Sequence, residues 1–268
     1  MKKLSTIAAA VMVLGALSGN ASAGGVFTVN PNSNGLSTAG TPVDVDQMTG
    51  SSSARITRLG GPGFNYAGEG YILFQGFTLQ GEDVDNNESR LGVDYRLYAV
   101  FNQTFSCSSA LSPGVSCGVT SIDLQLYADS RADGGFNSFT QASVTAPTSI
   151  VTRGEQVLLG EVTQAFVGFA GLNPLGGAHQ NINTNFQLTA AGMAFFVEPD
   201  PFYSLAYSAF NNTSDGLFCD TTNCVNANIV AIRNETGTTT FNEVPEPGSL
   251  AILGLGLLGL GAARRKKA

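Results

Sequence analysis

The central part of the chain, residues 24–243, alternates apolar and polar residues with a period of two over several stretches. In the clearest of them, residues 93–101, the odd positions are apolar or aromatic, and the even positions include Asp94, Arg96 and Tyr98. Successive side chains of a β-strand point to opposite faces, so this alternation predicts a strand with one face in a core and the other toward solvent.

Further predicted strands share this alternation or are short apolar runs between turns rich in Gly, Asn, Ser and Pro. They are residues 54–59, 71–79, 121–126, 157–169, 182–188, 203–210 and 228–233. After the predicted strand at 182–188, an apolar run at 193–197 continues up to the breaker at 198–201. We find no convincing helical stripe with a cap and a stop in residues 24–243. The pattern predicts an all-β domain, an antiparallel β-sandwich or barrel, and leaves the choice between the two open.

The N-terminus has the three parts of a secretory signal peptide. Two lysines precede an apolar segment at residues 7–17, and small residues then lead up to Ala23. A signal peptidase cuts after such a small-x-small pattern, so we expect cleavage between Ala23 and Gly24. Residues 1–23 are therefore excluded from the folded domain.

The C-terminus has the features of a processing and anchoring signal. Pro245, Glu246 and Pro247 precede an uncharged apolar run at residues 250–263. Four basic residues follow it: Arg264, Arg265, Lys266 and Lys267. Prolines are excluded from a helix interior, so the motif is expected to be an extended, accessible peptide beside a single short transmembrane helix. The basic end resists translocation and stays cytoplasmic, which places the preceding chain outside the cytoplasm.

The exported domain is strongly acidic once both ends are set aside. Between Gly24 and Val244 there are seven Arg, no Lys and 19 acidic residues, a net charge of −12. Proteins bind nucleic acid by neutralising phosphates with cations, so nucleic acid is not an expected partner. The chain is thus divided into a signal peptide (1–23), an all-β exported domain (24–243) and a sorting tail (244–268).

Four cysteines form two close pairs in the sequence. Cys107 lies near Cys117, and Cys219 lies near Cys224. Disulfides persist outside the cytoplasm, so we expect two of them. Three connectivities are possible, and proximity favours the local one. The wide spacing of the first pair does not suit a zinc site.

Few residues suggest catalysis or a cofactor. The only histidine, His179, follows a Gly-rich stretch and is expected to be an exposed loop residue, and the chain has no Gly-x-Ser-x-Gly motif. The glycine spacing at 254–259 resembles a dinucleotide fingerprint, but it lies in the apolar tail without a preceding strand. We therefore expect no enzyme activity and no cofactor. A secreted polysaccharide-active enzyme, in which two of the 19 acidic residues form a catalytic carboxylate pair, stays open as an alternative.

One acidic stretch partly matches a calcium-binding loop. Asp83, Asp85, Asn87 and Asp94 occupy the first, third, fifth and twelfth positions of an EF-hand-like loop, but Glu88 stands where the sharp turn requires Gly. We therefore predict no metal site, and keep a calcium-dependent carbohydrate-binding module as an alternative.

The export signal combined with Pro245-Glu246-Pro247, the short apolar segment and the basic end resembles the PEP-CTERM proteins of Gram-negative bacteria. In that family an exosortase, a membrane protease-transpeptidase, recognises the tail. Four segments of the domain also look like the flocculation-associated PEP-CTERM proteins. They are residues 27–31, 46–50, 91–98 and 185–189.

The resemblance implies a non-catalytic surface or extracellular-matrix protein that acts in exopolysaccharide-associated cell aggregation, in flocs or biofilm. Its expected partners are an exosortase-like enzyme, the inner membrane and an exopolysaccharide. The expected route is export, tethering to the inner membrane by the C-terminal helix, and then display at the cell surface or in the matrix.

Overall fold

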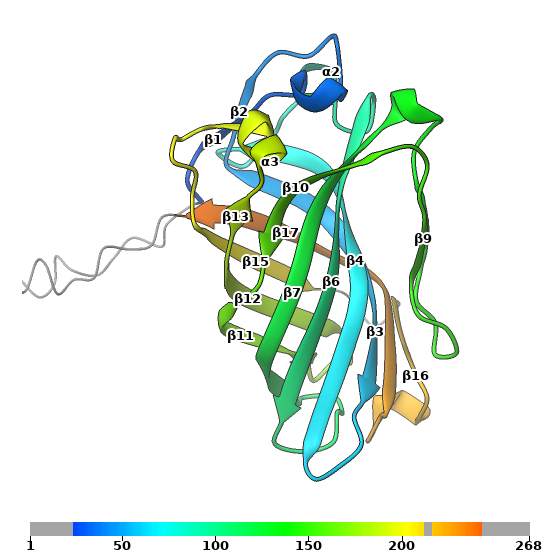
Figure 1. The fold of residues 1–268 in the computed structure, drawn as a ribbon. Coiled ribbons are helices and arrows are strands. Elements are labelled where there is room, and N and C mark those ends of the chain that lie inside the picture. Colours follow the sequence, from blue (N-terminus) through cyan, green and yellow to red (C-terminus); the bar gives the residue numbers. More distant parts are fainter. Residues whose placement is uncertain (1–23, 212–215, 243–268) are drawn as a thin grey trace, which may run out of the picture.

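The computed structural model describes residues 24–211 and 216–242, and it confirms the predicted all-β class (Figure 1). Eight antiparallel strands pair side by side around a closed ring, in the order in which they occur along the chain. They are β3 (Gln47–Arg58), β4 (Phe64–Leu79), β6 (Tyr95–Cys107), β7 (Ser116–Ser130), β11 (Ala165–Leu172), β12 (Ala178–Asn185), β15 (Leu205–Asn211) and β17 (Ile229–Asn242).

Two pairings close this ring. β17 pairs with β3 over residues such as Thr238 and Thr49, and β11 pairs with β7 through Ala170 and Cys117. The sequence leaves the choice between a sandwich and a barrel open, and the structure shows a barrel. In a closed barrel, each of these strands has a neighbour on both sides.

Shorter elements decorate the barrel. β10 (Gln156–Val162), β5 (Glu82–Asp83) and β16 (Leu217–Cys219) pair with its strands β7, β4 and β17, and β13 (Gln187–Leu188) pairs with β10. β1 (Phe27–Val29), β2 (Val43–Val45) and β14 (Phe196–Glu198) form a small sheet. The remaining elements are the hairpin of β8 (Ser138–Thr140) and β9 (Ser149–Val151), the helices α2 (Asn86–Ser89) and α3 (Ala190–Phe195), and the 3-10 turns η1 (Ser33–Gly35), η2 (Arg131–Asp133) and η4 (Thr222–Cys224).

The predicted alternation places side chains as expected along β6. Tyr95, Leu97, Ala99 and Phe101 are buried in the main core. Tyr98, expected on the solvent face, is also buried, because the segment that carries β8 and β9 lies over it and packs Phe139 on its ring at 5.3 Å. The outer face of β6 is thus covered at this point.

Three predicted segments differ from the structure. The strand at 182–188 is divided between β12, which ends at Asn185, and β13 (Gln187–Leu188). The apolar run at 193–197 is not extended throughout, because α3 ends at Phe195; the Thr189 hydroxyl accepts a hydrogen bond from the Gly192 amide and caps this helix. The predicted strand at 157–169 is a hairpin, since β10 ends at Val162 and β11 begins at Ala165. A six-residue helix is too short to show a periodic stripe, so packing rather than pattern specifies it.

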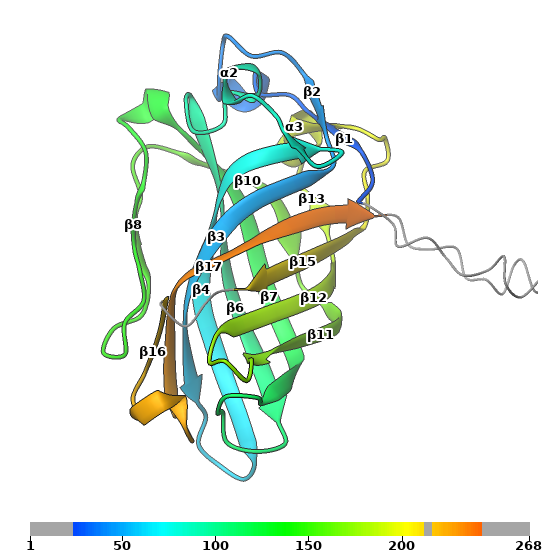
Figure 2. The same cartoon turned by 180° about the vertical axis from the view of Figure 1, so that it is seen from behind.

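The first and last described strands meet at one end of the barrel. The Gly25 amide donates to the Phe241 carbonyl at 2.8 Å, and α3, β1 and β2 cover the same end (Figures 1 and 2). We call this end the tail pole. The opposite end, which holds both cysteine pairs, is the distal pole. Within the described residues, no helix has the length and apolar character needed to cross a membrane.

Candidate functional site

The processing signals fall outside the described residues. These are the signal peptide with Ala23, the sorting motif Pro245, Glu246 and Pro247, and the basic residues Arg264, Arg265, Lys266 and Lys267. Gly24, the expected first residue of the mature chain, is described and lies at the tail pole. The sorting tail follows β17 directly, because this strand ends at Asn242.

Both cysteine pairs form the local disulfides that proximity favours. Cys107 and Cys117 are directly opposite each other on β6 and β7, with their Cα atoms 4.3 Å apart. Cys219 and Cys224 close the loop after β16, with Cα atoms 5.2 Å apart. The predicted connectivity is therefore confirmed.

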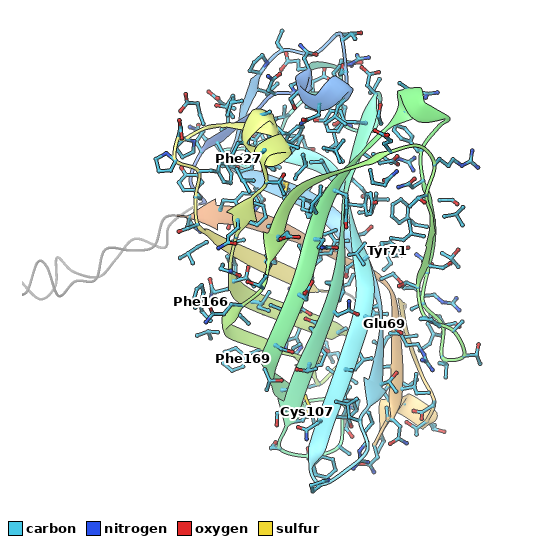
Figure 3. All side chains as sticks on the ribbon, in the orientation of Figure 1. Phe27, Glu69, Tyr71, Cys107, Phe166 and Phe169 are labelled. Carbon is cyan, nitrogen blue, oxygen red and sulfur yellow. A yellow bond between two sulfur atoms is a disulfide. The ribbon has the colours of Figure 1, made fainter. Side chains whose placement is uncertain are left out.

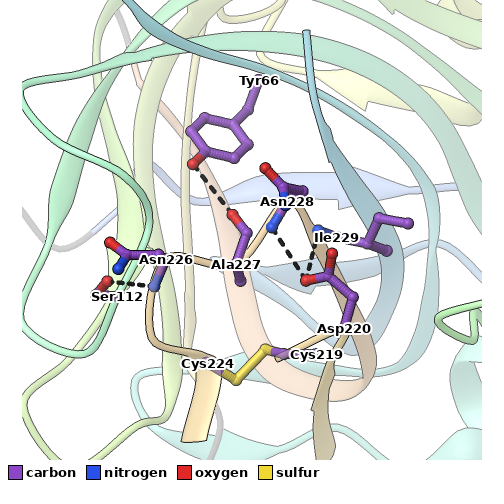
Figure 4. The surroundings of a disulfide bond; sticks show 9 residues. All are labelled: Tyr66, Ser112, Cys219, Asp220, Cys224, Asn226, Ala227, Asn228 and Ile229. Atoms are coloured by element: carbon purple, nitrogen blue, oxygen red, sulfur yellow. Dashed lines mark hydrogen bonds between the residues drawn. A yellow bond between two sulfur atoms is a disulfide. The ribbon is translucent and has the colours of Figure 1, made fainter. Parts of the chain in front are cut away.

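Hydrogen bonds hold the loop around the second disulfide (Figure 4). The Asp220 carboxylate accepts from the amides of Asn228 and Ile229 at 3.0 and 3.1 Å, and the Tyr66 hydroxyl donates to the Ala227 carbonyl at 3.2 Å. The distal pole is thus held by covalent and polar contacts together with a second hydrophobic cluster, to which Tyr66 and Ala227 belong.

Replacing Cys107 and Cys117 together by serine is expected to lower the free energy of unfolding by about 3 kcal/mol, because the cross-link restricts a ten-residue separation in the unfolded chain. The matched change at Cys219 and Cys224, five residues apart, should cost about 2 kcal/mol. Urea unfolding of the three proteins measures both values. An equal midpoint for all three would contradict the expectation.

The barrel interior is filled by side chains. The amide of Gln103 donates across it to Gln180 at 2.8 Å, and cavities of about 30 and 40 Å³ lie on either side of this bridge. Each cavity has room for only a few water molecules, since one water needs about 10 to 15 Å³ of such space. These cavities are therefore too small for a sugar or lipid.

One interior residue is a buried acid. A β-bulge between Ile232 and Glu235 turns the Glu235 carboxyl into the barrel, where Ser52 donates to Oε2 at 3.1 Å. Oε1 has no hydrogen-bond partner among the described residues. Burial raises the pKa of Glu235 to about 7, and the Ser52 bond opposes this shift. Glu235 is thus a titratable residue of the barrel interior.

The prediction that His179 is an exposed loop residue is wrong. It lies in β12, half-buried, between Gly171 of β11 and Asn211 of β15. Burial lowers the pKa of its imidazole, which favours the neutral form. The Gly-rich sequence before it forms the turn from β11 to β12, and β12 begins at Ala178, four residues before the start of the predicted strand at 182.

The EF-hand-like stretch uses its carboxylates for local structure. Asp85 accepts from the Asn87 amide at 2.8 Å and caps α2, and Asp94 forms an ion pair with Arg90 at 2.9 Å. The hydrogen bond from Arg90 lowers the pKa of Asp94. In the part of the chain that the structure describes, no group of three or more His, Cys, Asp or Glu residues is placed to hold a metal ion.

A shallow groove of about 400 Å³ crosses the outer face of β4, β6 and β7. Glu69 and Asp123 lie in it, on either side of Asn102, and Glu69 is labelled in Figure 3. Neighbouring strands are about 4.8 Å apart, so the backbones of the two acids are separated by about 9.6 Å. This pair gives the enzyme alternative a specific location.

A second groove lies under the segment of residues 137–152, which carries β8 and β9 and which we call the strap. Three contacts fasten the strap to the barrel. Arg233 Nε donates to the Ala142 carbonyl at 3.3 Å, Arg55 donates to the Val144 carbonyl at 3.2 Å, and the Ala142 amide donates to Ser53 at 3.0 Å. The strap therefore runs along the barrel wall in a fixed position.

The groove between the strap and the barrel has a volume of about 560 Å³, within the range of about 300 to 1,000 Å³ of small-molecule sites. Tyr71 and Leu73 of β4 belong to its lining, and Phe139 packs against Tyr71 at 5.0 Å (Tyr71 is labelled in Figure 3). The rest of its lining is polar: Ser51, Ser52, Gln75, Thr140, Gln141, Arg233 and Asn234. We call this site the strap groove.

The strap groove could not be predicted from the sequence, because residues far apart in the chain form it. Arg233 lies at the end of a predicted strand, whereas the strap segment has no periodic pattern. Nothing in the sequence distinguishes Arg233 from the other six arginines of the domain.

A comparison with family models matches the PEP-CTERM protein-sorting motif to residues 243–266. No curated protein and no solved structure matches the chain significantly.

Proposed function

The chain carries a PEP-CTERM protein-sorting motif and is thus an exported protein sorted by an exosortase system, and from this premise we propose that it acts as a non-catalytic surface or matrix protein in exopolysaccharide-associated cell aggregation. The observation that carries the proposal is the position of the motif. It begins at residue 243, immediately after the last barrel strand, so sorting displays the whole barrel.

Two further observations support this role. The two interior cavities described above are small, whereas the strap groove opens on the outer surface and combines amide, hydroxyl and aromatic groups. Such groups suit a polyhydroxylated ligand, because amides and hydroxyls both donate and accept hydrogen bonds. The disulfides suit a protein that works outside the cytoplasm.

Replacing Pro245, Glu246 and Pro247 together by alanine tests the sorting step. In a strain without the gene, the wild-type protein should restore aggregation and the triple variant should not. The mass of the extracted protein should show the tail retained in the variant and removed in the wild type. Ser249→Ala, a change in the same tail outside the Pro-Glu-Pro triplet, is the control and should behave as the wild type.

Restored aggregation with the triple variant would contradict the proposal that sorting is required. Wild-type complementation without any change in aggregation would contradict the role in aggregation itself.

The groove with Glu69 and Asp123 favours a second candidate function, hydrolysis of the polymer by two acids. We expect the intact protein to leave the viscosity of the exopolymer unchanged. A loss of viscosity that Glu69→Gln or Asp123→Asn abolishes would instead establish an enzyme.

A further inference from the structure

We propose that the strap groove binds a carboxylated saccharide, such as a uronate unit of an acidic polysaccharide, and that Arg233 contacts the sugar carboxylate. This inference rests on the proposed function and adds the class of ligand and the residue that recognises it.

The charge of the groove points to an anion. The exported domain has seven arginines against 19 acidic residues, so an anionic polymer is repelled by most of its surface. Among the residues that the structure describes, Arg233 is the only charged one in the lining of the strap groove. A ligand with a carboxylate therefore finds one cation there without a neighbouring carboxylate in the groove wall.

Arg233 is held in position before any ligand arrives. Its guanidinium carbon lies 4.2 Å from the centre of the Phe218 ring, and its Nε donates to the Ala142 carbonyl. This bond leaves the two Nη groups to donate to a ligand. A planar guanidinium binds a carboxylate through two parallel hydrogen bonds, and its fixed position reduces the entropy lost on binding.

The neighbours of Arg233 match the remainder of a sugar ring. Gln75, Gln141 and Asn234 are exposed amides, each able to donate to and accept from hydroxyl groups. Leu73 and Phe139 are half-buried and add apolar surface for the C–H face of the ring. The groove thus offers a cation, amides and an apolar wall within one site.

Calorimetric titration of the mature protein with tetragalacturonate tests the inference. The same oligomer with its carboxyl groups reduced to alcohols is the matched neutral probe. We expect binding of the acidic oligomer that weakens as salt is raised, and affinity for the neutral oligomer that is lower by about tenfold or more. This comparison uses the wild-type protein and needs no variant.

Arg233→Gln should weaken binding of the acidic oligomer by about tenfold or more, and Arg233→Lys should retain part of the affinity because the charge remains. Arg153→Gln is the control: it removes the same charge from an exposed residue that directly follows the strap and lies outside the groove lining, and it should bind as the wild type. Thermal unfolding of each variant verifies that it is folded.

Equal affinity for the two oligomers, or wild-type affinity in a folded Arg233→Gln variant, would overturn the inference. Co-sedimentation with the native exopolymer separates this failure from that of the proposed function. Exopolymer binding without oligouronate binding would overturn the ligand class alone. Absence of binding to both the exopolymer and the oligouronate would contradict the polysaccharide role as well.

Discussion

Truncation of Phe195 to alanine should lower the free energy of unfolding by about 3 to 5 kcal/mol. The side chain is fully buried at the tail pole, with its ring centre 5.7 Å from that of Tyr95 and 4.9 Å from that of Phe196. Removing it leaves a cavity among aromatic rings and also loses edge-to-face contacts. We expect this loss because α3 closes the tail pole mainly through this residue.

Met193→Ala is the matched control on the same helix. Met193 is 60% exposed, so its truncation should change the free energy of unfolding by less than about 0.5 kcal/mol. Urea unfolding followed by far-ultraviolet circular dichroism measures both variants. Equal losses for Phe195→Ala and Met193→Ala would show that α3 is not docked as described.

Replacing Glu235 by glutamine should remove a pH dependence of stability. The ordinary pKa of this carboxyl is 4.5, and burial raises it to about 7 in the barrel. The folded state therefore holds its proton more tightly than the unfolded state. Its contribution is fully present below about pH 4.5 and is lost as the pH rises to about 7, a change of about 3 kcal/mol.

Glutamine keeps the shape of the neutral acid but has no proton to lose. Glu235→Gln should thus match the wild type near pH 4 and exceed its stability by about 3 kcal/mol above pH 7. Glu69→Gln, at an exposed position on the outer face of β4, is the control and should keep the wild-type dependence on pH. Unfolding midpoints measured between pH 4 and pH 8 give the comparison. An unchanged slope in Glu235→Gln would contradict the assigned burial.

Much of the barrel could be predicted from the sequence, since a half-buried strand imposes a period of two. β6 and β7 follow the predicted alternation, and β12 buries Ile182 and Thr184 as expected. The extension of β17 beyond Arg233 could not be predicted, because its continuation is rich in threonine and contains a bulge. Closure of the barrel could not be predicted either, because the alternation specifies to which face of the sheet a side chain points and not which strands pair.

Some of the site residues could likewise be predicted from the sequence, and others could not. Local proximity along the chain was sufficient for Cys107 with Cys117 and for Cys219 with Cys224. The strap groove depends instead on contacts between distant segments, such as Arg233 with Ala142. The buried state of Tyr98 has the same origin, because Phe139 covers a face that the alternation assigns to solvent.

The last strand has a mechanical consequence. Arg233 and the start of the sorting tail lie on one continuous element, since β17 runs from Ile229 to Asn242 and the tail follows it. Tension between a polymer held at Arg233 and an anchor beyond residue 242 would run along the axis of this strand. It would load the ladders to β3 and β15 in shear, so that many hydrogen bonds share the force instead of opening one after another.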